Sequence, residues 1–259
     1  MKLTVFASGS SGNCLLLSGG GTNILIDAGI STRRLSGLLA SCCLTLQDIG
    51  GVLITHEHSD HISGLKTLLS RCSCELIAPH TVASRLIGQL PACEERLRIV
   101  PVGEEFSVGR LIVRAFHTPH DTDESVGYRV SCGTVFAVAT DMGCVTDEIR
   151  AGLAGADAVL IEANHDEQML RYGRYPAPLK RRILSDRGHL SNDCCAALVQ
   201  ELAQSGTGTI ILGHLSRENN TPEAARRAVE PALDGTGARL LIAPQLGFLE
   251  VKVEKLCLV

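Results

Sequence analysis

Three histidines and an aspartate lie within six residues, directly after a short apolar stretch at 51–54. Neutral imidazole and carboxylate groups are common ligands of zinc, iron and manganese. Burying so many polar groups without partners would be costly, so a loop rich in histidine by chance explains the cluster poorly. The cluster consists of His56, His58, Asp60 and His61. Spacing by two in an extended turn points His56 and His58 to one side, while Asp60 and His61 can reach a second ion. The pattern therefore indicates a site for two metal ions.

Three further motifs follow the cluster along the chain. They are His117-Thr118-Pro119-His120-Asp121, Ala139-Thr140-Asp141-Met142-Gly143 and Ile210-Ile211-Leu212-Gly213-His214-Leu215-Ser216. In type and order, the four motifs resemble those of the metallo-β-lactamase fold hydrolases, and the resemblance covers essentially the whole chain. It implies an α/β fold, a four-layer αββα sandwich of two similar halves, with residues 1–259 as a single catalytic domain.

The resemblance also implies which side chains hold the metals. One ion would be bound by His56, His58 and His120, and the second by Asp60, His61 and His214. Asp141 and a hydroxide would bridge the two ions. His117 competes with His120 for its role, but in relatives the ligand follows the Thr-Pro turn, so His120 is favoured and His117 is expected to lie in a strand. These ligand types suit zinc, manganese and iron alike.

Two more motifs point to the reaction. Glu162 follows an apolar stretch at 158–161, and His189 lies in a Gly-His turn that precedes a helix. They look like paired motifs of nucleic-acid-cleaving members such as ribonuclease Z, in which a glutamate orients a histidine that serves the leaving group. We therefore expect Glu162 and His189, together with Asp60, to be the catalytic residues. Two divalent ions about 3.5–4 Å apart can lower the pKa of a shared water and stabilise both the entering and the leaving oxygen.

A loop rich in glycine and serine at 8–13 joins the first two expected strands. Backbone N–H groups of such loops can bind anions, and a tight hairpin is the alternative explanation. Its candidate substrate contacts are Ser10, Ser11 and Asn13. Together with Glu162, His189 and the stretch at 214–219, this loop resembles the bacterial YycJ/WalJ-type branch, whose members are described as DNA exonucleases. The resemblance implies cleavage in the 5′ to 3′ direction.

Basic residues cluster between 171 and 187, where six lysines and arginines accompany a single acid, Asp186. Arg174, Arg181 and Arg182 are candidates for contacts with backbone phosphates, and two interleaved tyrosines suit stacking on bases. A solvated helix face is the alternative. The position directly before the Gly-His turn favours phosphate contact.

The composition limits other classes of function. A formal net charge of −4 gives no general electrostatic footprint for nucleic acid, so a polyanion needs a local basic patch or the metals. Eleven cysteines form no regular framework, and the first residues contain no signal peptide, so we expect reduced thiols and a cytoplasmic location. No run of eighteen apolar residues occurs, so we expect no membrane span. The sequence does not indicate an oligomeric state.

Short apolar stretches separated by turn residues must position these side chains. Strands are expected at 3–7, 14–17, 23–27, 52–55, 111–116, 126–130, 135–139, 158–161, 209–212, 239–242 and 248–251. Helices are expected at 31–39, 61–69, 193–203 and 222–233, the last with Thr221 as its N-cap and Pro222 in its first position. The glycines at 19–21 are expected to turn a hairpin.

The favoured function is hydrolysis of DNA by an exonuclease that uses two divalent ions. The alternative is a small-molecule metallohydrolase that cuts a thioester, lactone or cyclic phosphodiester, which would use the same metals without a basic stretch. An oxygen-reducing di-iron protein is disfavoured, because such relatives carry a carboxylate where this chain has His58. A non-catalytic binding module is disfavoured because every ligand position is filled.

Overall fold

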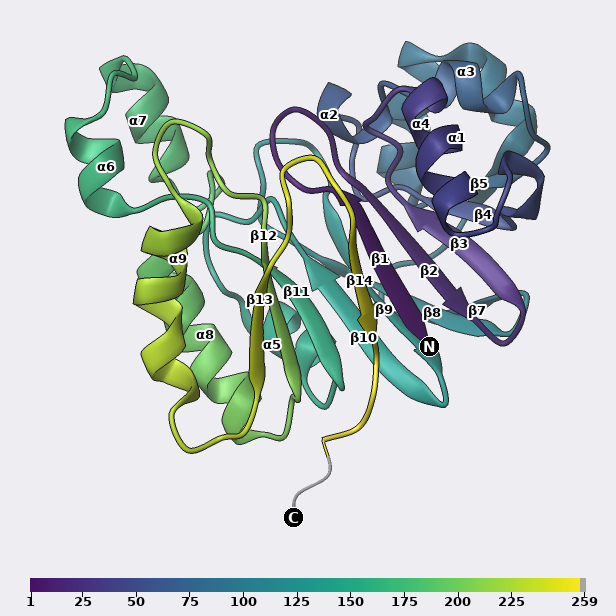
Figure 1. Ribbon diagram of the computed structural model, residues 1–259. Coiled ribbons are helices and arrows are strands. Elements are labelled where there is room, and N and C mark those ends of the chain that lie inside the picture. The colour runs from purple at the N-terminus through teal and green to yellow at the C-terminus, as the bar shows by residue number, and fades with distance from the viewer. Residues whose placement is uncertain (257–259) are drawn as a thin grey trace.

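Within residues 1–256, two mixed β-sheets of seven strands each pack against each other, and helices cover both outer faces (Figure 1). The computed structural model describes residues 1–256. In each sheet, parallel strands occupy one side and antiparallel strands the other. This arrangement confirms the expected α/β fold with four αββα layers and two similar halves.

The two sheets have different strand orders but equal size. The first sheet contains, in spatial order, β14 (Leu249–Lys252), β1 (Lys2–Ala7), β2 (Cys14–Gly19), β3 (Thr22–Ile26), β4 (Gly51–Leu53), β5 (Glu75–Ala78) and β6 (Leu97–Ile99). The second contains β13 (Arg239–Ile242), β12 (Thr209–Gly213), β11 (Ala158–Glu162), β10 (Thr134–Ala139), β9 (Val126–Cys132), β8 (Leu111–His117) and β7 (Glu105–Val108).

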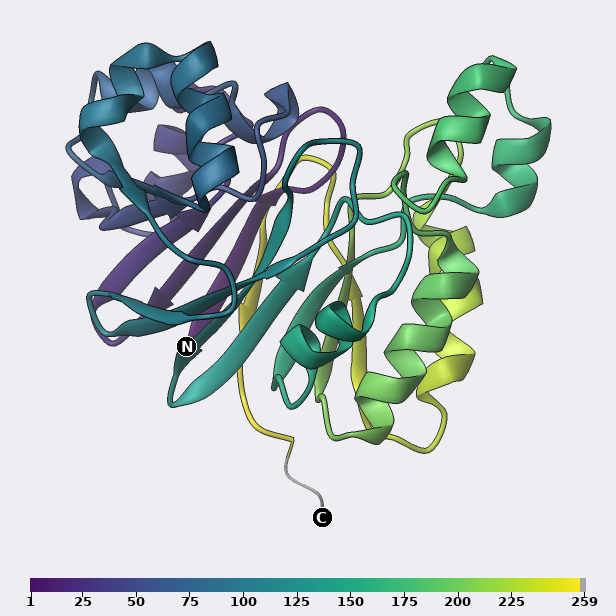
Figure 2. The same cartoon turned by 180° about the vertical axis from the view of Figure 1, so that it is seen from behind.

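The helices divide between the two sheets. The first sheet is covered by α1 (Thr32–Ser41), α3 (Leu65–Leu69) and α4 (His80–Gln89), and the second by α5 (Asp147–Leu153), α8 (Asn192–Gln204) and α9 (Pro222–Val229). The short helix α2 (Ser59–Ile62) precedes α3, while α6 (Glu167–Tyr172) and α7 (Ala177–Ile183) extend beyond the strand ends of the second sheet (Figure 2). No helix within residues 1–256 is long and apolar enough to cross a membrane.

Strands buried on both faces explain the long apolar stretches. Along β2, Leu15 and Leu17 point into the core between the sheets, whereas Cys14 and Leu16 pack under the helices. Because successive side chains of a strand point to opposite faces, a strand covered on both sides needs apolar residues at every position. Strands near a sheet edge differ: Ile112 of β8, the strand next to the edge strand β7, is 44% exposed between buried neighbours.

Most expected elements lie within two residues of their expected bounds. The hairpin at 19–21 and the N-cap at Thr221 are confirmed. The single helix expected at 61–69 is wrong, because the chain breaks it into α2 and α3 at Gly64. There the Gly64 N–H donates to the Ala28 oxygen at 2.9 Å, and a Cβ at Gly64 would lie 2.1 Å from the Ile30 oxygen. The loop after β3 therefore packs directly against the break and fixes the turn that carries Asp60.

Candidate metal centre

The candidate ligands lie just beyond the C-terminal ends of four strands. His56 follows β4, His120 follows β8, Asp141 follows β10 and His214 follows β12. Asp141 and His214 have φ angles of 57° and 54°. Residues other than glycine rarely adopt this left-handed conformation, and backbone strain of this kind concentrates at functional sites. The strands thus deliver these side chains to one place in a constrained conformation.

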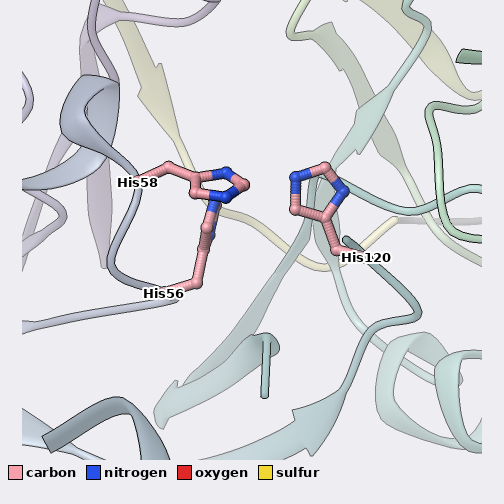
Figure 3. A group of neighbouring side chains, drawn as sticks. All are labelled: His56, His58 and His120. Atoms are coloured by element: carbon pink, nitrogen blue, oxygen red, sulfur yellow. The ribbon is translucent and has the colours of Figure 1, made fainter. Parts of the chain in front are cut away.

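Three imidazoles form the first group of possible ligands. His56, His58 and His120 each offer a ring nitrogen within 4.8 Å of the others, and Figure 3 shows His56 and His58 facing His120. His120 Nδ1 lies 3.2 Å from the Gly188 oxygen and donates to it, which leaves Nε2 for a metal. Burial, followed by the effect of the neighbouring His61 imidazole, lowers the pKa of His56 well below its usual value, so this ring is neutral, as a ligand must be.

A second group of possible ligands lies beside the first. Asp60, His61 and His214 each offer one atom within 4.8 Å of the others. Asp141 lies between the two groups, with Oδ2 3.3 Å from His61 Nε2 and Oδ1 3.9 Å from His120 Nε2. A single carboxylate is therefore within reach of both groups.

Buried polar atoms without partners test whether this centre suits metal ions. His56 Nε2, Asp141 Oδ2 and His214 Nε2 are buried and have no hydrogen-bond partner among residues 1–256. Leaving such atoms unsatisfied costs free energy, and nitrogen and carboxylate oxygen donors at this spacing are what a divalent ion binds. The donor set therefore fits divalent metal ions.

Glu162, at the end of β11, connects this centre to a further histidine. It is fully buried, and its Oε1 accepts hydrogen bonds from His189 Nδ1 at 2.7 Å and His214 Nδ1 at 3.1 Å. Its Oε2 accepts from the backbone N–H of Met142 at 2.8 Å, next to Asp141. One carboxylate thus holds the imidazoles of His189 and His214 and the backbone next to the candidate ligand Asp141.

The charges around Glu162 decide its protonation. Burial opposes its ionisation, but the neighbouring imidazoles of His189 and His214 and their hydrogen bonds lower the pKa of Glu162 to about 2. Burial alone would lower the pKa of His189, but the Glu162 carboxylate raises it above its usual value. Because Nδ1 of His189 faces Glu162, its Nε2 is the nitrogen left to face other groups.

A cavity of about 190 Å³ lies beside this pair. Its lining includes Ser10, Asp121, Tyr175, Arg182, His189, His214 and Ser216. The side chain of His189 is 23% exposed, whereas that of Glu162 is completely buried. A ligand in this cavity therefore meets His189 but not Glu162.

The residues that the sequence predicted to contact substrate occupy three kinds of position: in the lining of the cavity, exposed outside the lining, or buried. Ser10 and Arg182 line the cavity, and Arg182 is ion-paired with Asp121. Ser11 is exposed and accepts a hydrogen bond from Arg217, while Arg174 and Arg181 are exposed and lie outside the lining.

Asn13 is buried, whereas a side chain that binds substrate would be accessible to it. Its side chain exchanges hydrogen bonds with the Gly9 backbone, and its Nδ2 lies 3.3 Å from Asp60 Oδ2. It therefore holds the loop at 8–13 against the turn that carries Asp60.

His117 lies apart from both groups. It ends β8 with a side chain that is 52% exposed, and its Nδ1 lies 3.0 Å from Glu148 Oε1. The expectation that His117 is a strand residue is confirmed.

The sequence analysis missed two residues that support the centre. Asp27, directly after β3, has a φ of 60° and lies 2.8 Å from His61 Nδ1. Thr55 donates to Asp27 through its N–H and its hydroxyl, both at 2.9 Å. In the sequence, Asp27 could be noticed only as a carboxylate at the end of a buried strand, with no motif around it.

Comparisons with known proteins agree with the architecture and the donor groups. A family model described as Beta-lactamase superfamily domain matches residues 22–215. Among solved structures, the metallo-β-lactamase fold protein YhfI from Bacillus subtilis superimposes with a TM-score of 0.72 at 15% identity, covering 97% of this chain and 99% of that one. A likeness at this identity shows the fold.

Sequence relatives give the narrower relationship. Exodeoxyribonuclease YycJ of Bacillus anthracis is 37% identical over 241 residues, which cover 92% of this chain and 90% of the relative. Exodeoxyribonuclease WalJ of Streptococcus pneumoniae is 37% identical over 230 residues, which cover 86% of this chain and 85% of the relative. The resemblance inferred from the motifs is confirmed: this chain is a metallo-β-lactamase fold hydrolase and belongs to the family of the YycJ and WalJ proteins.

Proposed function

We propose that this protein is a metal-dependent exonuclease that hydrolyses the phosphodiester bonds of DNA from the 5′ end. The observation that carries the proposal is the Glu162–His189 pair, which lies beside the metal centre and faces the cavity with one imidazole. A hydroxide nucleophile needs no such group, but a departing nucleoside alkoxide needs a proton. The names of both 37% identical relatives, which are exodeoxyribonucleases, agree with this substrate.

Two divalent ions are proposed as cofactors, with zinc, manganese and iron as the candidates. The first would be held by His56, His58 and His120, the second by Asp60, His61 and His214, and Asp141 would contact both. When bound, such ions supply an activated water and stabilise charge on the phosphoryl oxygens.

The protein's own residues would orient the reacting groups and move a proton. Glu162 holds His189 with Nδ1–H toward itself and raises the pKa of His189, so that the imidazolium keeps a proton on Nε2 for the leaving oxygen. Asp60 is proposed as both a ligand and a catalytic residue, because its Oδ2 lies 3.5 Å from His61 Nε2 and 3.8 Å from His214 Nε2. Asn13 would keep Asp60 in place.

The substrate would enter beside α7. Ser10 and Arg182 line the cavity and are proposed to contact the reacting nucleotide, with Ser11, Arg174 and Arg181 farther along the strand. We propose that residues 1–259 act as a single catalytic domain. The eleven cysteines form no regular disulfide framework, which suits a reducing compartment, and we propose that the enzyme acts in the cytoplasm.

Incubation of the purified protein with DNA and RNA labelled at either end, with manganese, magnesium or zinc in turn, tests the proposal. We expect mononucleotides to be released progressively from the 5′ end of DNA. The Asp141→Ala variant, prepared identically, controls for contaminating nucleases. Hydrolysis of a thioester, lactone or cyclic phosphodiester without cleavage of DNA under any metal would overturn the proposal in favour of a small-molecule hydrolase.

A further inference from the structure

Arg217 is an exposed residue three positions after the candidate ligand His214, in the loop that follows β12. Its Nη2 donates to Ser11 Oγ at 2.7 Å, and its Nε donates to Gln245 Oε1 at 2.7 Å. Gln245 is held in turn, because its Nε2 donates to the Leu215 oxygen at 3.2 Å. Three separate loops therefore fix the direction of one guanidinium group.

Both partners of this guanidinium are neutral. Within residues 1–256, no carboxylate oxygen lies within 4.0 Å of the Arg217 nitrogens, so its charge is uncompensated. The arginines on the α7 side of the cavity differ: Arg182 is paired with Asp121, and Arg187 donates to the backbone oxygens of His120 and Thr122. A guanidinium has five N–H groups, so three of those of Arg217 remain available after the bonds to Ser11 and Gln245.

Arg217 directly follows a residue that lines the cavity. Ser10 and Ser216 line the cavity beside His189 and His214, and their neighbours in sequence, Ser11 and Arg217, are exposed and hydrogen-bonded to each other outside the lining. At about 190 Å³ the cavity is smaller than the roughly 300 Å³ at which ordinary ligand pockets begin. It can hold a reacting phosphate and part of one nucleotide, so the next phosphate of a strand would lie at the rim.

We propose that Arg217, oriented by Ser11 and Gln245, binds the backbone phosphate adjacent to the scissile one. The inference rests on the proposed phosphodiesterase function and adds a requirement for a substrate with a second, charged phosphate. A planar guanidinium with free N–H groups suits the two oxygens of a phosphodiester, and a compact ammonium does not reproduce that geometry.

Kinetics of an Arg217→Gln variant test the subsite, with Arg34→Gln as the matched control. Arg34 is an exposed arginine on α1, at the outer face of the first sheet, and its replacement changes the net charge equally. On a single-stranded oligodeoxynucleotide, we expect kcat/KM of Arg217→Gln to fall about 10- to 100-fold, as for loss of a charged hydrogen bond. On bis(4-nitrophenyl) phosphate, which has no second phosphate, both variants should match the wild type.

A modified substrate identifies the partner of Arg217. An uncharged methylphosphonate at the linkage adjacent to the scissile one should slow the wild type by about the same factor and slow Arg217→Gln no further. An equal additional loss in the variant, or normal cleavage of DNA by the variant, would overturn the subsite while leaving the exonuclease assignment intact. Failure of the wild type to cleave any DNA would instead overturn the proposed function and the subsite with it.

Discussion

Asp27 Oδ2 lies 2.8 Å from His61 Nδ1, and both side chains are almost completely buried. Because Nδ1 donates to this carboxylate, the proton of the ring is fixed there, and Nε2 faces Asp60, Asp141 and, at 2.9 Å, the Asn13 amide nitrogen. Thr55 fills the remaining positions of the Asp27 carboxylate with two hydrogen bonds. The loop after β3 thus orients a candidate ligand that follows β4.

The first prediction concerns this support. Replacing Asp27 by asparagine keeps the shape but removes the charge that orders His61, and we expect metal affinity to fall about 10- to 100-fold. Metal content after dialysis against a graded series of chelator concentrations measures the change. Asp193→Asn, at an exposed position in the first turn of α8, is the control. Equal metal retention by both variants would show that His61 needs no such partner.

A second prediction concerns the number of ions. Elemental analysis of the wild type should find about two divalent ions per chain, and the Asp141→Ala variant should retain fewer. Because the ions bind the folded state, their removal by a chelator should lower Tm, and added manganese or zinc should restore it. Metal well below one ion per chain that neither manganese nor zinc restores would contradict the two-metal centre.

The fold was predictable where the physical signal was local. Strands such as β2 and β11 are continuous apolar stretches because both of their faces are buried, and this pattern is visible in the sequence. Strands β5, β6 and β7 have only three or four residues and include exposed positions, so no periodic pattern marks them. The break at Gly64 depends on a loop some 35 residues earlier, which the sequence around Gly64 does not reveal.

The candidate site likewise contains residues that are recognisable from local sequence and residues that only distant contacts bring into place. His56, His58, Asp60 and His61 are close in sequence, so their grouping is visible before any fold is known. Asp27 and Arg217 gain their roles only through contacts with distant segments, at His61 and Ser11 respectively. Asn13 was expected to contact substrate, yet its buried amide binds Gly9 and approaches Asp60. A loop pattern of glycine and serine does not reveal whether such a residue binds an anion or holds the loop in place.

A third prediction concerns the basic residues near α7. Arg174 and Arg181 are exposed, and reversing both charges should weaken binding of single-stranded DNA. The slope of log affinity against log salt concentration should fall by about 0.7 for each lost phosphate contact. Arg182 is left unchanged, because its reversal would place two carboxylates together at Asp121. An unchanged slope would mean that these arginines are simply solvated and do not contact phosphates.

A fourth prediction concerns stability near the first ligand cluster. Tyr128 is fully buried, and its hydroxyl donates to the Ile54 oxygen at 2.7 Å, two residues before His56. In Tyr128→Phe this buried oxygen loses its donor, so we expect the free energy of unfolding to fall by about 1–3 kcal/mol. Urea denaturation measures the change, with Tyr172→Phe at an 85% exposed position as the control. Equal stability of the two variants would contradict a structural role for this bond.

The fifth prediction concerns His189 and its partner Glu162. If His189 gives a proton to the leaving oxygen, His189→Ala should keep its metals and its fold but lose about 10²- to 10⁴-fold in the turnover of DNA. The loss should shrink on bis(4-nitrophenyl) phosphate, because a nitrophenolate departs without a proton. His80→Ala, at the exposed start of α4, is the matched histidine control.

Glu162→Gln should show a milder form of the same defect, and because Glu162 also binds His214, it should lose metal more readily than His189→Ala does. Loss of metal from His189→Ala would make this residue a ligand or a support for one. Unchanged metal content together with unchanged cleavage of DNA would remove the main mechanistic support for a nuclease.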